Sequence, residues 1–422
     1  MWIKGGTIFD PAGGTVQAGD IHIADGVISG VYPGGNNGKD GEIVDAQGLW
    51  VLPGLIDMHV HFRDPGYEYK EDIVSGSLAA AAGGVTTVVC MPNTDPVNDN
   101  PSVTRYIVEK ARAKAAVRVL PAGALTKDLN GIELAEMGLM KAAGIVAVTD
   151  DGKTVENASM MRRAMEYAAT FGLPVITHCQ DKGLSAGGVM NESALSSRLG
   201  LAGIPSASED IIISRDVLIA GYTGLPVHIT HVSTRTGIDI IRQAKRDGIR
   251  VTCDVTPHHL LLTEDRVRGY DTKAKMYPPL RKEEDRRALI EGLTDGTVDC
   301  IATDHAPHAK DEKDLDFDLA PFGIIGLQTL LPAIMQVHRE CGIDFMELLK
   351  RATVNPARIL GIEGGVLTAG ARADIVLFDP EVKWKFTEES ILSKSKNSPF
   401  LGKEFKGRVV HTIVCGNSVY RI

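Results

Sequence analysis

The sequence lacks the marks of a disulfide scaffold, an exported protein and a membrane protein. Its six cysteines are scattered over 422 residues, and no two of them form a Cys-x-x-Cys pair. Most lie in apolar runs, where reduced cysteine packs as a small hydrophobic residue, so we expect a cytoplasmic protein. The chain does not open on a basic segment followed by an apolar core, and no run approaches the roughly 20 apolar residues of a membrane span. We therefore expect neither a signal peptide nor a membrane span.

The sequence is also short of positive charge. Its 45 lysines and arginines stand against 54 aspartates and glutamates, which gives a formal net charge of −9. This balance disfavours nucleic acid or an anionic membrane as the main partner and leaves a small molecule as the expected one. Hydrophobic and charged contents of 44% and 23% are ordinary for a globular protein. The length allows one large domain and a smaller one.

The middle of the chain alternates between strand and helix patterns. Eight apolar segments are typical of buried strands, at residues 55–61, 85–91, 117–123, 145–149, 174–178, 227–231, 251–255 and 298–303. Helical patterns separate them, for example at residues 75–82, 102–113, 159–170, 211–220 and 237–247. Eight strand–helix units in series predict a (β/α)8 TIM barrel over residues 55–363. A doubly wound open sheet is the alternative, but it would not gather side chains from so many strand ends.

The two ends of the chain carry a different pattern. Residues 1–54 alternate short apolar runs with turns, and Asp25-Gly26 between strand-like halves predicts a hairpin. Residues 364–422 look similar. Neither flank is large enough to bury much core alone. We therefore expect the two flanks to form one small β-sandwich domain, with the barrel inserted between them.

Potential metal ligands stand at the ends of the predicted strands. His59 and His61 close the first strand, and residues two apart on a strand point to the same side. Later strands end in similar residues, namely His178, His231, Asp304 and the pair Asp150-Asp151. The carboxyl ends of barrel strands meet at one face, where imidazoles and carboxylates would suit a divalent transition metal. If their strand continues, Asp150 and Asp151 point opposite ways, so only one of them is expected to be a ligand.

Motifs at these strand ends resemble those of the bacterial type I dihydroorotases, within the amidohydrolase superfamily. The first are His-Val-His-Phe-Arg-Asp-Pro-Gly at 59–66, Met-Pro-Asn-Thr at 91–94, Thr-Asp-Asp-Gly at 149–152 and Gly-Gly-Val-Met-Asn-Glu at 187–192. The others are His-Val-Ser-Thr at 231–234, Pro-Pro-Leu-Arg at 278–281, Asp-His-Ala-Pro-His at 304–308 and Pro-Phe-Gly at 321–323. The resemblance covers essentially the whole chain. The first two motifs together are far more specific than His-x-His alone.

The resemblance implies two zinc ions per chain. It implies six ligands: His59, His61 and Asp304 for the first ion, His178 and His231 for the second, and Asp151 as the bridge. Many superfamily members bridge their metals with a carboxylated lysine instead. This chain has no lysine at the end of its fourth strand, because Lys153 lies beyond the turn. A bridging carboxylate fits the type I pattern.

The resemblance also implies an activity: the reversible interconversion of N-carbamoyl-L-aspartate and (S)-dihydroorotate in pyrimidine biosynthesis. Asp304 is the expected catalytic residue, which accepts a proton and returns it to the departing nitrogen. Arg63 is the expected partner of the substrate carboxylate, because its planar guanidinium matches a carboxylate with two hydrogen bonds. An ion pair between Arg63 and Asp64 is the alternative. The other expected substrate contacts are His61, Asn93, Tyr277, His308, Phe322 and Gly323.

Tyr277 departs from the family's pattern. The residue before Pro278 is usually an asparagine that contacts the pyrimidine ring, whereas a phenol is larger and lacks the amide's paired donor and acceptor. This departure leaves open a hydantoinase-like or allantoinase-like cyclic amidase. A second alternative is a barrel without catalysis that serves as a partner of aspartate transcarbamoylase, although loss of metal ligands would be expected there. The resemblance further implies a homodimer and allows a complex with that transcarbamoylase.

Two segments keep open interpretations. The charged residues 309–320 follow the last predicted strand and form either a solvated loop or a mobile lid over the site. His258 and His259 end the seventh strand, where one of them would either orient a ligand or pack at the rim.

Overall fold

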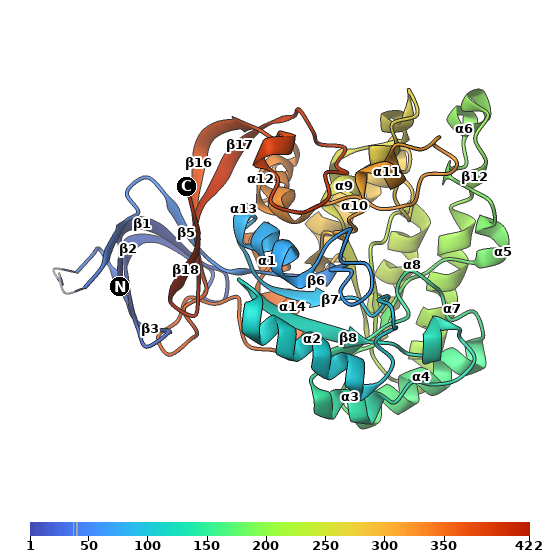
Figure 1. Cartoon of the computed structure of the whole chain (residues 1–422), viewed down its shortest axis with the longest axis horizontal. Helices are drawn as coiled ribbons and strands as arrows, with labels where there is room; N and C mark the ends of the chain where they lie inside the picture. Colours follow the sequence, from blue (N-terminus) through green and yellow to red (C-terminus); the bar gives the residue numbers. More distant parts are fainter. Residues whose placement is uncertain (37, 39–40) are drawn as a thin grey trace.

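Eight parallel strands form the centre of the molecule (Figure 1). The structure, a computed structural model, describes residues 1–36, 38 and 41–422. The strands pair as two four-stranded sheets, in the orders β6-β7-β8-β9 and β10-β13-β14-β15. Parallel bridges from Val148 to Val175 and from Val60 to His305 join the two sheets at both seams. The predicted TIM barrel is confirmed.

The barrel strands coincide with the eight predicted segments. In the first sheet they are β6 (Leu55–Val60), β7 (Val85–Cys90), β8 (Arg118–Gly123) and β9 (Ala147–Val148). In the second they are β10 (Ile176–Thr177), β13 (Val227–Ile229), β14 (Val251–Val255) and β15 (Cys300–Ile301). β6 and β7 are buried along their whole length, which explains their continuous apolar runs.

Helices pack around the outside of the barrel. They are α1 (Ile73–Ala82), α2 (Pro101–Lys114), α3 (Met137–Ala143), α4 (Ala158–Thr170), α7 (Ala207–Thr223), α8 (Arg235–Arg246), α10 (Glu283–Asp295), α12 (Leu330–Cys341), α13 (Phe345–Arg351) and α14 (Val354–Leu360). Their starts follow local sequence: Asp72 caps α1 by accepting from the Ser75 N–H, and Asn100 caps α2 just before Pro101. Within the described ranges, every helix is too short or too polar to cross a membrane.

Short elements extend from the carboxyl-end side of the barrel, on the right in Figure 1. Between β10 and α7 lie α5 (Lys182–Ser185), β11 (Met190–Asn191), α6 (Ala194–Leu199) and β12 (Gly203–Ile204). After β14 come α9 (Pro257–Leu261) and two 3-10 turns, and after β15 comes α11 (Lys310–Lys313). These connections surround the strand ends where the candidate ligands lie.

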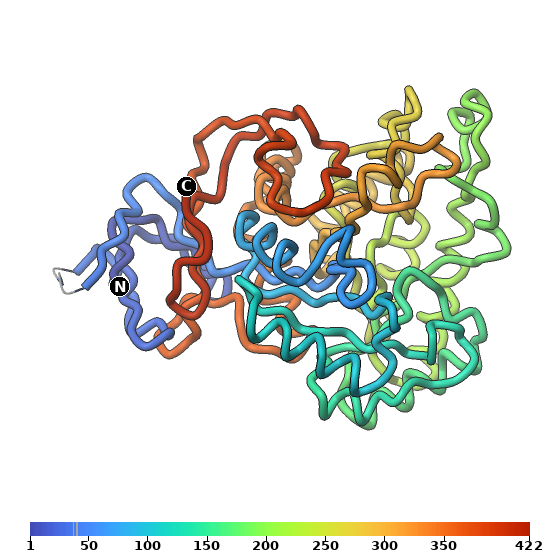
Figure 2. Tube along the Cα trace, in the orientation of Figure 1, coloured from blue at the N-terminus to red at the C-terminus, as the bar shows by residue number. Residues whose placement is uncertain are grey.

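The two ends of the chain form one eight-stranded sheet, and both termini lie in it (Figure 2). Its strands are β1 (Trp2–Asp10), β2 (Thr15–Ala24), β3 (Val27–Pro33), β4 (Ile43–Asp45), β5 (Trp50–Pro53), β16 (Ile375–Lys385), β17 (Glu404–Val414) and β18 (Asn417–Arg421). The antiparallel pairing of β5 with β16 joins the two ends. The sheet has a core of its own, with Ile8, Ile21 and Ile375 fully buried. The structure confirms that the two flanks form one separate β-sheet, and Asp25 and Gly26 form its predicted hairpin turn with φ of +50° and +78°.

Candidate metal centre

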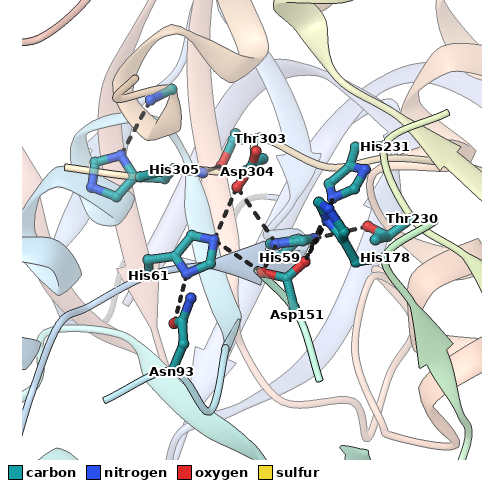
Figure 3. Close-up of polar contacts among 12 residues, drawn as sticks. His59, His61, Asn93, Asp151, His178, Thr230, His231, Thr303, Asp304 and His305 are labelled. Carbon is teal, nitrogen blue, oxygen red and sulfur yellow. Dashed lines mark hydrogen bonds and ion pairs between the residues drawn. The ribbon is translucent and has the colours of Figure 1, made fainter. Parts of the chain in front are cut away.

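Asp151 lies between two pairs of histidines (Figure 3). Its Oδ2 atom is 3.2 Å from Nε2 of His59 and 3.4 Å from Nε2 of His61. Its Oδ1 atom is 3.5 Å from Nδ1 of His178 and 3.5 Å from Nε2 of His231. One carboxylate therefore contacts both pairs, with one oxygen atom for each.

Asp304 joins the first of these pairs. Its Oδ1 atom is 3.0 Å from Nε2 of His61 and 3.5 Å from Nε2 of His59. The second pair is in direct contact, with 3.0 Å between Nδ1 of His178 and Nε2 of His231. The backbones of His231 and Asp304 have φ of +40° and +47°, a region that residues with a side chain rarely adopt. Backbone strain of this kind is concentrated at functional sites.

The polar atoms of this centre fit metal ions better than they fit one another. Nε2 of His59 and Oδ1 of Asp151 are buried and have no hydrogen-bond partner among the described residues, although buried polar atoms are normally paired. A cation could also accept the lone pairs of both facing nitrogens of His178 and His231. Two overlapping groups hold ligand atoms close enough to share an ion, and Asp151 belongs to both. Their other members are His59 and His61 in one group, and His178 and His231 in the other.

The carboxylates and imidazoles of the centre shift one another's pKa. Burial would lower the pKa of His59, but the carboxylates of Asp151 and Asp304 raise it to about 10. Burial would likewise raise the pKa of Asp151, yet His59 and the other pair hold it well below its ordinary range. The carboxylates thus stay ionised and attract positive charge, which a divalent ion would supply in place of protons.

Behind His59, a chain of buried polar side chains crosses the barrel interior. Nδ1 of His59 is 2.8 Å from Oγ1 of Thr230, which donates to Oδ2 of Asp254 at 2.9 Å. Asp254 also accepts from the His231 backbone N–H at 2.7 Å and contacts Nε2 of His228 at 2.9 Å. Such contacts orient metal-binding histidines and fix their tautomers. Sequence reasoning missed Thr230, although its position two residues after His228 on an inward-facing strand is a usable signal.

Asn93 and Asp150 both lie near the candidate ligands, but only Asn93 contacts one of them. Oδ1 of Asn93 is 2.9 Å from Nδ1 of His61, so Asn93 contacts a candidate ligand as well as the pocket. Asp150 turns away from the centre and accepts from the backbone N–H groups of Leu125 and Thr126 at 2.8 and 2.9 Å. Of the two adjacent aspartates, only Asp151 lies in the candidate metal centre.

A cavity of about 710 Å³ opens beside the centre, a size that suits a small substrate. The predicted site residues that line it are His61, Arg63, Asn93, Asp151, His178, His231, Tyr277, Asp304, His308, Phe322 and Gly323. Within the described ranges, Arg63 has no carboxylate within 4 Å, and its Nε donates to the Pro307 carbonyl at 3.3 Å. Asp64, the alternative partner considered above, pairs with Lys110 at 2.7 Å instead. The guanidinium is therefore available to an anionic ligand.

Aromatic rings form another side of the cavity. The ring of Tyr277 stacks on that of His178, with centroids 5.4 Å apart, and lies 5.0 Å from the ring of Phe322. Nε2 of His308 is 2.8 Å from the carbonyl oxygen of Phe322 and 3.4 Å from Nη2 of Arg63. Tyr277 thus presents an aromatic face at the position where the family that the sequence resembles usually has an asparagine.

The segments with open interpretations are ordered by specific contacts. Residues 310–313 form α11, and Lys313 and Phe317 are buried, so the segment 309–320 is more than a solvated loop. Nε2 of His259 is 3.2 Å from the carbonyl oxygen of Pro278, beside Tyr277. His259 therefore supports the chain next to the cavity.

Comparison with known sequences relates the whole chain to one family. The family described as Dihydro-orotase-like matches residues 48–237. Proteins named Dihydroorotase from Geotalea daltonii and Geobacter metallireducens are 51% and 52% identical to this chain over 421 residues. A protein with the same name from Acetivibrio thermocellus is 47% identical over 427 residues. Each match covers 100% of this chain and 99% of the relative.

Comparison with solved structures agrees at the level of the fold. An L-hydantoinase from Arthrobacter aurescens has a TM-score of 0.89 and 25% identity, and the match covers 100% of this chain and 96% of that one. A D-hydantoinase at 22% identity has a TM-score of 0.86, with 100% and 95% covered. About half of all residues are shared with the sequence relatives over the full length of both chains. This chain therefore belongs to the dihydroorotase family.

Proposed function

We propose that this chain is a metal-dependent dihydroorotase, which hydrolyses the cyclic amide of dihydroorotate to N-carbamoyl-L-aspartate and closes it in the reverse direction. The observation that carries the proposal is the position of Asp151, with one carboxylate oxygen on each histidine pair. The names of relatives about 50% identical over the full chain support the choice of substrate. This reaction belongs to pyrimidine biosynthesis.

We assign two zinc ions to the centre. The proposed ligands are His59, His61 and Asp304 for one ion, His178 and His231 for the other, and Asp151 for both. Imidazole and carboxylate ligands suit zinc. The second group has only three protein ligands, which would leave room for a water molecule. When bound, such ions polarise the substrate carbonyl and lower the pKa of the water that adds to it.

Asp304 is the proposed proton carrier. Its side chain contacts the histidines through Oδ1 and also lines the cavity, so it lies between the ligands and the substrate. As water adds to the amide carbon, Asp304 accepts the proton that the water loses. It then passes this proton to the ring nitrogen as the carbon–nitrogen bond breaks, so one carboxylate serves first as base and then as acid.

Arg63 is the proposed partner of the substrate carboxylate. Its guanidinium lines the cavity without a carboxylate of its own in the described structure. His308 lies next to it, and Asn93, Tyr277, Phe322 and Gly323 also line the cavity. We expect Arg63→Lys to raise the KM for dihydroorotate about tenfold or more, because a lysine loses the paired geometry. An unchanged KM would place the carboxylate elsewhere.

The deciding experiment measures the hydrolysis of dihydroorotate by zinc-loaded protein, with a chelated sample as the control. Hydantoin and allantoin are tested alongside as neutral rings. We expect turnover of dihydroorotate that the chelator abolishes and that the neutral rings do not share. Turnover of a neutral ring alone would contradict the proposal and support a hydantoinase-like enzyme, which the aromatic face of Tyr277 and the hydantoinase fold allow.

The non-catalytic alternative is disfavoured by the gathered ligands, since a scaffold has no need of six potential metal ligands in one centre. A homodimer, a complex with aspartate transcarbamoylase and a cytoplasmic location stay predictions. So do the domain borders, with the small domain formed by residues 1–54 and 364–422 and the hydrolase barrel by residues 55–363.

A further inference from the structure

In the described part of the chain, two buried lysines next to the cavity make hydrogen bonds only to backbone groups. Lys275 and Lys313 are 2% and 4% exposed. Every hydrogen bond that their ammonium groups make within the described ranges goes to a main-chain carbonyl. A buried ammonium without a carboxylate partner costs free energy, so its presence calls for a specific role.

All but one of the carbonyls that they bind belong to one side of the cavity, which we call the wall segment (residues 317–323). Nζ of Lys275 donates to the carbonyls of Phe317 and Asp318 at 2.7 and 3.1 Å. These bonds hold the beginning of the wall segment. Asp318 and the residues after it, up to Gly323, all line the cavity.

Lys313 holds the other end of the same segment. Its Nζ donates to the carbonyls of Pro321 and Gly323 at 2.8 and 3.1 Å, and to that of Lys275 at 3.3 Å. The Gly323 N–H in turn donates to the Lys275 carbonyl at 3.0 Å. Asn397 also donates to the Gly323 carbonyl, at 3.0 Å. The two lysines thus fix the path of the segment between its ends.

The wall segment carries groups that face the proposed substrate. The ammonium of Lys275 lies 4.7 Å from the centroid of the Phe322 ring, which contacts the ring of Tyr277. The carbonyl of Phe322 is also the partner of His308. A displacement of this segment would therefore move Phe322 and disturb its contacts with Tyr277 and His308. These are three of the groups that we expect around the substrate.

The charges of the two lysines make this arrangement costly. Burial lowers the pKa of Lys275 to about 8, against the opposing charge of Asp318. Burial and the charge of Lys275 lower the pKa of Lys313 to about 7, against the opposing charges of Asp271 and Glu312. Apolar side chains would fill the same space at a lower cost in folding free energy. The two charges therefore indicate a role beyond packing.

We propose that Lys275 and Lys313 are positioning residues, which shape the wall segment for substrate binding by holding its backbone carbonyls. The inference deepens the proposed function and rests on it for the identity of the substrate. We assign neither lysine a part in the bond-breaking step, because the ammonium groups are engaged by main-chain carbonyls. Their loss should therefore affect substrate binding more than turnover.

The first test compares Lys313→Met and Lys275→Met with Lys310→Met, using zinc-loaded full-length protein. Lys310 is exposed on the same short helix as Lys313 and serves as the matched control. We expect either buried-site variant to raise the KM for dihydroorotate about tenfold while kcat changes less than about threefold, the pattern of lost binding. Melting temperature and zinc content identify a variant that has failed to fold, in which case the other one decides.

The second test reads the wall segment without any turnover. A protease that cuts before aspartate has one exposed site inside the wall segment, at Asp318, and two just before it, at Asp314 and Asp316. Cleavage there should be about ten times faster in Lys313→Met or Lys275→Met than in wild type or Lys310→Met, since loosened segments are cut more readily. A KM or a cleavage rate within twofold of the control overturns the proposal. If wild type fails to hydrolyse dihydroorotate, the proposed function fails, and the cleavage rates still decide whether the lysines hold the wall segment.

Discussion

The two halves of the barrel supply matching side chains to the candidate metal centre from different places in the sequence. Each half provides two imidazoles and one carboxylate: His59, His61 and Asp151 from β6–β9, and His178, His231 and Asp304 from the strands β10–β15. In the first half both histidines lie at the end of one strand, with His59 inside β6 and His61 just after it. In the second half they follow neighbouring strands and are 53 residues apart. The first pair is therefore set by local geometry and the second by the pairing of β10 with β13.

The two carboxylates differ in reach. Asp151 contacts both histidine pairs, whereas Asp304 crosses the seam of the barrel to contact only the first pair. The first group thus gathers four side chains and the second three. Neither half holds a complete centre, so the closed barrel is itself a requirement for the site.

The largest loss is expected when the ligand shared by both groups is removed. We expect Asp151→Ala to lose metal from both groups and to lower kcat/KM by about 10³-fold or more, because metal and ligand act together. Metal content by mass spectrometry and hydrolysis of dihydroorotate check this. Asp150→Asn is the matched control, since Asp150 faces Leu125 and Thr126. An Asp151→Ala protein that keeps both metals would contradict the shared role.

Substituting the carboxylate that crosses the seam tests a second difference. Asp304→Asn keeps an oxygen near His61 but cannot carry a proton, so kcat should fall about 10²- to 10⁴-fold while the second group keeps its metal. Steady-state kinetics and metal content are measured on the same sample. A near-normal kcat would remove Asp304 from the proton path.

The residues of this candidate centre were predictable because each lies at or just after the carboxyl end of a strand. The eight strand patterns and the spacing of His59 and His61 fix which side chains meet at the carboxyl-end face. The exact strand ends were harder, since β13 and β15 stop before the positive φ values of His231 and Asp304. Left-handed backbone interrupts strand pairing, and no single residue type in the sequence signals it here.

The supporting contacts were not predictable from local patterns. Thr230 contacts His59 across 171 residues of sequence, a pairing that only the closed barrel creates. Lys313 lies in a run of charges, and such runs are typical of solvated loops, yet the chain buries it against main-chain carbonyls. Charge patterning indicates solvent exposure on average, and it fails where a cation replaces solvent as the partner of a buried backbone.

The unequal ligand counts predict unequal metal retention. His178→Asn leaves the second group with two side chains, so we expect one of two zinc ions to be lost while the first group stays filled. His61→Asn removes one of four ligands from the first group and should retain more metal at the same chelator concentration. Zinc content after graded chelation measures both. Equal retention in the two variants would show that the two ligand groups bind metal equally.

The smallest expected effect on zinc binding concerns Thr230, a residue of the second half of the barrel that contacts His59 of the first half. Thr230 follows β13, accepts from Nδ1 of His59 and donates to Asp254, which leaves Nε2 of His59 as the metal-facing atom. Thr230→Val keeps the side-chain shape but removes this hydroxyl, so zinc affinity should fall about tenfold, the low end for such a support. Thr252→Val is the control, because it removes a partly buried hydroxyl that contacts His228 instead. Competition with a chelator gives both affinities, and values within twofold of each other would mean that the first half positions His59 unaided.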